Sequence, residues 1–160
     1  MFNNSQAMPF PFSIKYSTTL KEKIVPENYL KILNHIRAFI IDKPAKDIII
    51  ENNRLSFKPS TYYWNWNIMV SIEKGIFSII EKEGHVILTY EFFMYRLFIT
   101  TGIMSVIAGI LTQILWIPIA AFLWLCGMNW IITLVRHKSM LDDLTSEIDA
   151  LIKYENDNQD

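Results

Sequence analysis

The sequence has few glycines, one cysteine and, over one long stretch, no charge at all. Of 160 residues, five are glycine, and Cys126 is the only cysteine. A single cysteine excludes a disulfide within the chain and fits a reducing compartment. No Asp, Glu, Lys, Arg or His occurs in the 39 residues from Leu97 to Val135. This gap excludes an ordinary surface helix there, because such a helix carries a polar face.

The uncharged stretch predicts a helical hairpin that spans a membrane. Eighteen or more apolar residues without charge are typical of one transmembrane helix. A single helix of the whole stretch would be about 58 Å long, whereas the hydrocarbon core is about 30 Å thick. We therefore expect a hairpin over 94–135, with spans of about 94–115 and 118–135. The turn is expected at Trp116-Ile117-Pro118, since proline favours the first turn of a helix. The alternative is a buried helix pair in a soluble protein.

Flanking charge predicts the orientation of this hairpin. Arg96 precedes the first span, Arg136 and Lys138 follow the second, and the turn carries no Lys or Arg. By the positive-inside rule, both termini are expected in the cytoplasm.

Small and polar residues within the spans are candidates for hairpin packing. Small side chains let helix backbones approach closely in lipid. Asn129 is expected to form a hydrogen bond across the hairpin, and self-association through the small residues is an open alternative. No ionisable side chain lies within the spans, which argues against a pump or transporter. The candidates are Gly102, Ser105, Ala108, Gly109, Gly127 and Asn129.

Residues 13–93 predict one cytoplasmic α+β domain, an antiparallel sheet covered by one helix. The helix is expected from Pro26 to Ile41, where apolar residues recur at helical spacing. Asn52-Asn53, Lys74-Gly75 and Glu83-Gly84 are expected to be turns between strands. The expected strands cover residues 13–19, 47–51, 54–58, 66–73, 76–81 and 85–91.

The two ends of the chain differ in character. Residues 1–12 are expected to form a flexible N-terminus without the features of a signal peptide. Residues 139–154 predict a separate C-terminal amphipathic helix, capped by Ser139, that packs on the domain or on a second copy. Residues 155–160 are expected to be disordered.

The most unusual soluble segment is rich in aromatic residues. It is a candidate interaction surface, since aromatic residues are frequent in interface hot spots. Two other interpretations stay open: the rings anchor at the bilayer surface, or they cap the end of the core. The residues are Tyr62, Tyr63, Trp64 and Trp66.

A search for catalytic chemistry finds no constellation. His35, His85 and His137 have no metal-ligand partner at helical spacing, and each is expected at the surface. No glycine-rich phosphate loop occurs, and residues 1–95 carry 11 basic against 9 acidic side chains, which is no nucleic-acid footprint. We expect no catalytic residue, cofactor, metal or nucleic acid.

The arrangement resembles that of small, uncharacterised bacterial membrane proteins with an N-terminal α+β domain, a two-span transmembrane hairpin and a short C-terminal helix. The resemblance implies this fold and a location in the bacterial inner membrane, and no activity. It is carried by Phe12-Ser13-Ile14-Lys15, the hairpin from Asp47 to Lys58, Gly75-Ile76-Phe77, Leu88-Thr89-Tyr90 and Arg136-His137-Lys138.

The sequence thus favours a membrane-anchored binding or scaffolding protein whose partners are the lipid bilayer and either another protein or a second copy. Two alternatives stay open. One is a small-ligand sensor or enzyme with a pocket near residues 62–66, and the other is an immunity-type protein that neutralises a toxin at the membrane.

Overall fold

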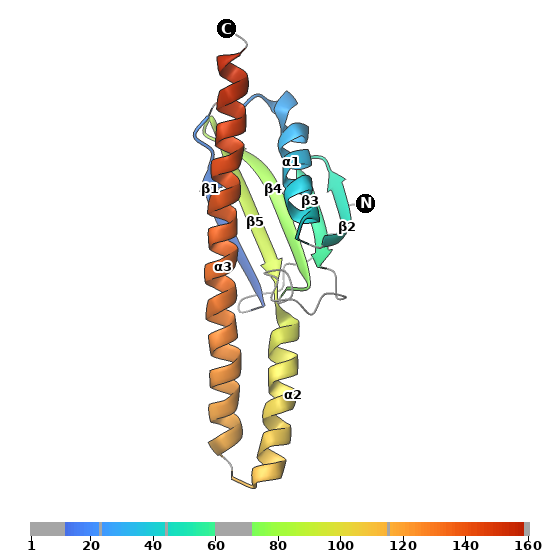
Figure 1. Ribbon diagram of the computed structural model, residues 1–160, viewed down its shortest axis with the longest axis vertical. Helices are drawn as coiled ribbons and strands as arrows, with labels where there is room; N and C mark the ends of the chain where they lie inside the picture. Colours follow the sequence, from blue (N-terminus) through green and yellow to red (C-terminus); the bar gives the residue numbers. More distant parts are fainter. Residues whose placement is uncertain (1–11, 23, 44, 60–71, 115, 159–160) are drawn as a thin grey trace.

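The computed structural model describes residues 12–22, 24–43, 45–59, 72–114 and 116–158 (Figure 1). They form an α+β domain and a helical hairpin that projects from one end of it. The prediction of an α+β class with an antiparallel sheet is confirmed.

Within the described residues, the sheet has five antiparallel strands in the order β1-β5-β4-β3-β2. The first strand, β1, pairs with the last, β5, from Ser13↔Phe93 to Thr19↔Ile87. Two of the predicted turns are confirmed: Asn52 (φ 51°) begins the β2–β3 turn, and Glu83-Gly84 forms the β4–β5 turn. The strands are β1 (Ser13–Thr19), β2 (Ala45–Glu51), β3 (Arg54–Pro59), β4 (Lys74–Lys82) and β5 (His85–Phe93).

The predicted turn at Lys74-Gly75 is wrong, because both residues lie within β4. Gly75 pairs with Phe92 of β5 and with Phe57 of β3. A Cβ atom on Gly75 would lie 2.3 Å from the Phe57 ring, so this glycine makes room for an aromatic side chain instead of turning the chain. Residues 66–71 of the strand predicted at 66–73 lie outside the described residues, and Ile72 and Glu73 are not in a strand.

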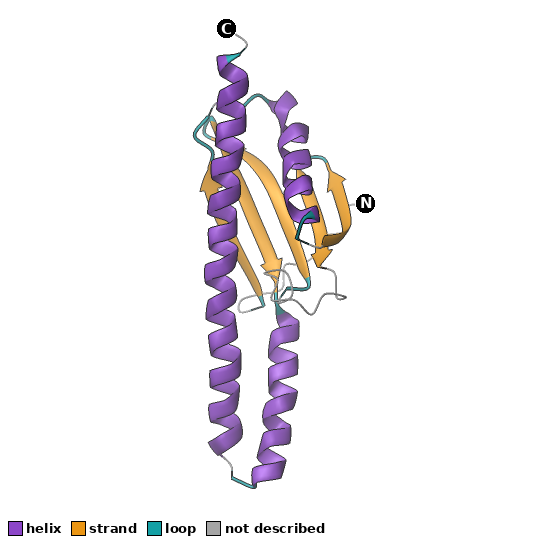
Figure 2. Cartoon of the chain, viewed as in Figure 1, coloured by secondary structure: helices purple, strands orange, loops and turns teal. Residues whose placement is uncertain are grey.

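Two helices, and not one as predicted, cover the same face of the sheet (Figure 2). One is α1 (Tyr29–Ile41), which follows a short 3-10 helix at Pro26–Asn28. The other is the second half of α3. A shared core contains inward-facing side chains of the sheet and of both helices, among them Ile36, Leu55, Phe77, Leu88, Tyr90, Leu144 and Ile148.

The helix α3 (Trp116–Asp157) is continuous over 42 residues, so the predicted break between a second span and a helix at 139–154 is wrong. The segment from Arg136 to Ser139 changes the helix from apolar to charged, but it contains no glycine or proline that would interrupt its hydrogen bonds. Ser139 is an exposed residue within the helix and not its cap. The domain core therefore extends beyond residues 13–93 to Ile152.

The hairpin turn lies earlier than predicted. The first hairpin helix, α2 (Tyr95–Thr112), ends where Gln113 adopts a left-handed conformation (φ 55°) and its N–H donates to Gly109 O. Because α3 begins at Trp116, both Trp116 and Pro118 lie in its first turn. A short turn after Thr112 is enough to reverse the chain, and the antiparallel pairing of α2 with α3 follows from it (Figure 1).

Candidate functional site

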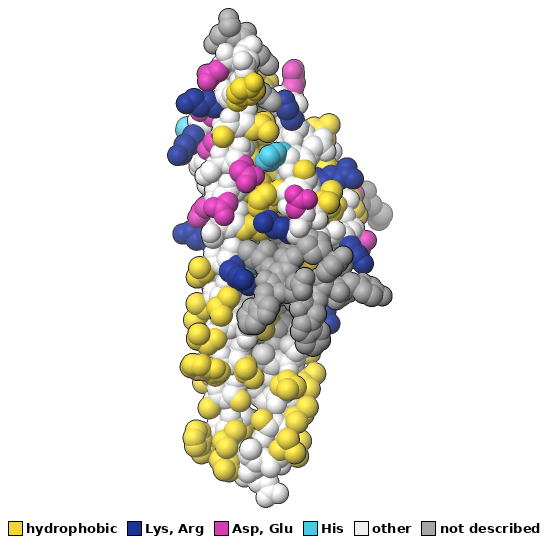
Figure 3. Space-filling model, viewed as in Figure 1, with side chains coloured by type: hydrophobic (Ala, Val, Ile, Leu, Met, Phe, Trp, Pro, Cys, Tyr) yellow, Lys and Arg dark blue, Asp and Glu magenta, His cyan; other side chains and the backbone are white. Residues whose placement is uncertain are grey.

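The exterior of the hairpin is apolar on the face shown in Figure 3, whereas charged side chains gather over the domain. The structure contains two helices, Tyr95–Thr112 and Trp116–Tyr154, that are long and apolar enough to cross a membrane. Only 6% and 11% of their most apolar stretches are buried. Core helices of soluble proteins pass the same length test but are mostly buried, so the hairpin differs from them.

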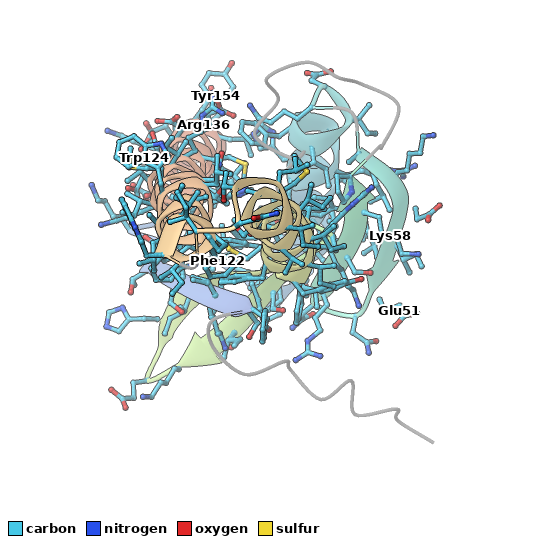
Figure 4. All side chains as sticks on the ribbon, turned by 90° about the horizontal axis from the view of Figure 1, so that it is seen from below. Glu51, Lys58, Phe122, Trp124, Arg136 and Tyr154 are labelled. Atoms are coloured by element: carbon cyan, nitrogen blue, oxygen red, sulfur yellow. The ribbon has the colours of Figure 1, made fainter. Side chains whose placement is uncertain are left out.

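Large side chains produce this exterior on both helices. Viewed from the tip of the hairpin, Trp124 projects from α3 on the side away from α2 (Figure 4). Isolated apolar side chains are common on protein surfaces, but a continuous apolar belt marks contact with a partner or a lipid phase. The belt includes Ile103, Val106, Ile110, Leu111, Trp116, Ile119, Leu123, Trp124, Ile131 and Val135, each at least half exposed.

The interior of the hairpin is lined by small and weakly polar side chains. Ser105, predicted as a packing residue, is buried, together with Thr101 on α2 and with Cys126 and Thr133 on α3. The hydroxyls of Thr101 and Thr133 donate to carbonyl oxygens of their own helices, at 2.7 and 2.8 Å. Their hydrogen-bonding needs are thus met without a partner on the opposite helix.

The other predicted packing residues differ in how closely they approach the opposite helix. Gly109 contacts α3 closely, because a Cβ there would lie 3.0 Å from Pro118 Cγ. Ala108 is half-buried, and around Gly102 and Gly127 no described atom comes within 4 Å of an added Cβ. Asn129 is exposed and its side-chain N–H donates to Leu125 O of the same helix at 2.6 Å, so the expected hydrogen bond across the hairpin is wrong.

The junction between hairpin and domain is held by specific polar contacts. His137, expected at the surface, is fully buried against the sheet, and its ring stacks on Phe92 with centroids 4.4 Å apart. Its Nδ1 lies 2.9 Å from the hydroxyl of Tyr90, and burial raises the pKa of Tyr90 well above its ordinary value, so that the phenol stays protonated. The Tyr16 hydroxyl donates to Leu134 O, one turn before His137.

The start of α2 is held by an acidic side chain from the edge of β4. Glu73 Oε1 accepts a hydrogen bond from the backbone N–H of Arg96 at 2.7 Å. This is the role of an N-terminal cap, since the first N–H groups of a helix have no partner within it. Burial nevertheless raises the pKa of Glu73 above its ordinary value, because desolvation outweighs the hydrogen bonds that favour the carboxylate.

Basic residues gather at the end of the domain from which the hairpin projects. The predicted orientation determinants Arg96, Arg136 and Lys138 lie at this level, where β5 leads into α2 and α3 enters the domain (Figure 1). Arg136 points from α3 away from α2 (Figure 4). Lys43 follows the end of α1, and its ammonium lies 4.3 Å from the centre of the Phe39 ring.

An open groove of about 590 Å³ lies between the end of α1 and the part of α3 that enters the domain. Its floor is apolar, and its rim carries both signs of charge. At the far end, His35 Nε2 of α1 lies 3.5 Å from the carboxylate of Glu147 on α3. The lining residues are Phe39, Lys43, Arg136, Ser139, Met140, Asp143, Ser146 and Glu147. Sequence patterns did not reveal this groove, because it depends on how two distant helices pack.

The candidate interaction surface at Tyr62, Tyr63, Trp64 and Trp66 lies outside the described residues. In the part of the chain that the structure describes, no group of three or more His, Cys, Asp or Glu side chains could hold a metal ion. No family model, curated protein or solved structure matches the chain.

Proposed function

We propose that this chain is a membrane-anchored binding or scaffolding protein of the bacterial inner membrane. The hairpin of α2 and α3 crosses the bilayer, and the α+β domain lies in the cytoplasm with both termini. The observation that carries the proposal is the distribution of charge: an exposed apolar hairpin without a charged side chain between Leu97 and Val135, and basic residues only at its domain end.

Two connections without a flexible linker support the scaffolding role. Strand β5 ends at Phe93 and α2 begins at Tyr95, and the single residue between them, Met94, is fully buried. On the other side, α3 passes from the hairpin into the domain core as one helix. A domain held in this way presents its surfaces at a fixed height and orientation above the bilayer, which lowers the entropy cost of binding a partner there.

The membrane location is tested with single cysteines and a thiol reagent that does not cross membranes, applied to cells without an outer barrier. The background is Cys126→Ala, and the reporter cysteines replace the exposed residues Ser17, Thr112 and Ser146. We expect labelling of the Thr112 variant in intact cells and labelling of the other two only after lysis. Labelling of Ser17→Cys or Ser146→Cys in intact cells would overturn the orientation, and release of the protein by alkaline carbonate would overturn the membrane span.

The binding role is tested on the face of the sheet opposite the helices. Ile49 and Ile80 are 52% and 42% exposed on this face, where we expect a protein partner to dock. Replacing either with lysine should abolish capture of the partner in mild detergent. The matched control is Leu30→Lys on the outer side of α1, which is 59% exposed and should leave capture intact. Equal capture by all three variants, or no capture above background by the native chain, would contradict this role.

A further inference from the structure

We propose that the groove between α1 and α3 binds the headgroup of a phospholipid that carries a primary amine, namely phosphatidylethanolamine. This inference rests on the membrane location proposed above. It goes beyond that location by assigning a specific ligand to a groove of the domain that begins where α3 leaves the hairpin.

The groove carries opposite charges in a fixed order along α3. Because α1 runs toward the hairpin and α3 runs away from it, Lys43 and Arg136 lie at the membrane end of the groove (Figure 1). Asp143 and Glu147 lie farther from the hairpin, at about 10 and 16 Å from Arg136 along the helix axis. Among the described residues, no ion pair joins either basic residue to either acidic residue. Glu147 already lies 3.5 Å from His35, so Asp143 is the acidic residue that we assign to the ligand.

This order matches the order of charges in the headgroup. The phosphate of a phospholipid lies next to its glycerol, at the level where Arg136 ends the apolar part of α3. The amine is the outermost group, so that it extends toward Asp143. Arginine and lysine are well suited to phosphate, and carboxylates accept hydrogen bonds from an ammonium.

The same residues disfavour the other common headgroups. An anionic headgroup without an amine would meet Lys43 and Arg136 but would leave Asp143 unpaired beside its negative charge. A quaternary amine cannot donate hydrogen bonds and is recognised by several aromatic rings. Among the described residues that line the groove, one aromatic ring is present, that of Phe39, and it already lies under the ammonium of Lys43. The primary amine is therefore the chemistry that satisfies both ends.

The test uses the full chain, purified in detergent and titrated with short-chain lipids, with bound lipid counted by native mass spectrometry. We expect phosphatidylethanolamine to bind at least tenfold more tightly than phosphatidylglycerol or phosphatidylcholine. Lys43→Gln and Asp143→Asn should each weaken its binding at least tenfold. Their matched controls are Lys138→Gln and Asp142→Asn, which replace exposed neighbours that do not line the groove and should change binding less than twofold.

Three outcomes would overturn the inference. One is that phosphatidylglycerol binds as tightly as phosphatidylethanolamine and that Lys43→Gln weakens binding whereas Asp143→Asn does not. This result would indicate a general anion site. Another is an equal effect of the control variants, which would describe unspecific surface charge. The third is tight binding of soluble glycerophosphoethanolamine without retention of the lipid, which would assign the groove to a soluble compound. Release of the chain by carbonate would instead refute the proposed location, so the two failures are distinguishable.

Discussion

Replacing Leu144 with alanine tests whether the second half of α3 belongs to the domain. Leu144 is fully buried in the core that α3 shares with α1 and the sheet, although it lies nine residues after the last apolar residue of the span, Val135. Truncation of a buried leucine removes its transfer free energy and leaves a cavity, which together cost about 3 kcal/mol. If the helix instead left the domain or paired with another chain, the same change would cost the domain almost nothing.

Native-state hydrogen exchange of the full chain in detergent measures this cost without unfolding the hairpin. The slowest amides of β4 and β5 exchange through opening of the whole domain, so their rates report its free energy of unfolding. A loss of about 3 kcal/mol should accelerate them roughly a hundred-fold, since each 1.4 kcal/mol is a factor of ten. The control Leu30→Ala removes the same atoms from a side chain that is 59% exposed and should change the rates only about twofold. An acceleration below threefold for Leu144→Ala would refute the packing of α3 on the domain.

Three further changes probe the sheet and the junction. Gly75→Ala places a Cβ against the Phe57 ring and should cost roughly 1–3 kcal/mol of unfolding free energy, and restoration of stability by Phe57→Leu in the same chain would verify the cause. Since the pKa of Glu73 is raised in the folded state, stability should fall as pH rises from the ordinary glutamate pKa through the folded one; Glu73→Gln should flatten this slope in melting curves, and an unchanged slope would contradict the assignment. Tyr90→Phe removes the hydroxyl that faces His137 Nδ1 and should cost about 1–3 kcal/mol in denaturant unfolding, whereas a neutral effect would show that this contact contributes nothing.

Strands and turns of the domain could be predicted from local patterns. In β1, apolar and polar side chains alternate, and half-buried and exposed positions alternate with them. Asn52, Glu83 and Gly84 adopt the left-handed backbone, which asparagine and glycine tolerate better than most residues. Gly75 misled the prediction because a glycine is required equally by a tight turn and by a close aromatic neighbour, and only the packing distinguishes the two.

The burial of His137 could have been found from helical periodicity. Its separations from Leu141, Leu144 and Ile148 are 4, 7 and 11 residues, which place it on their stripe. The predicted stripe instead begins after Ser139, because a change in charge beside a capping residue is typical of a helix boundary. The groove could not be predicted in this way, since Phe39 and Lys43 meet the residues of α3 only when α1 packs along it.

One face of α3 serves two different surroundings, and this explains why a single periodicity rule fails for it. Along this face, Cys126 and Thr133 are buried within the hairpin, and His137 and Leu144 are buried within the domain. In the hairpin the inner face is small and weakly polar while the outer face is large and apolar, as expected where lipid surrounds a helix pair and close packing holds it together. In the domain the inner face is apolar and the outer face charged, as expected in water. The reversal falls between Val135 and Arg136. Next to it, Leu134 O accepts a hydrogen bond from Tyr16 of β1, and His137 Nδ1 lies within hydrogen-bond distance of the Tyr90 hydroxyl of β5. A tilt of the hairpin would therefore act directly on β1 and β5.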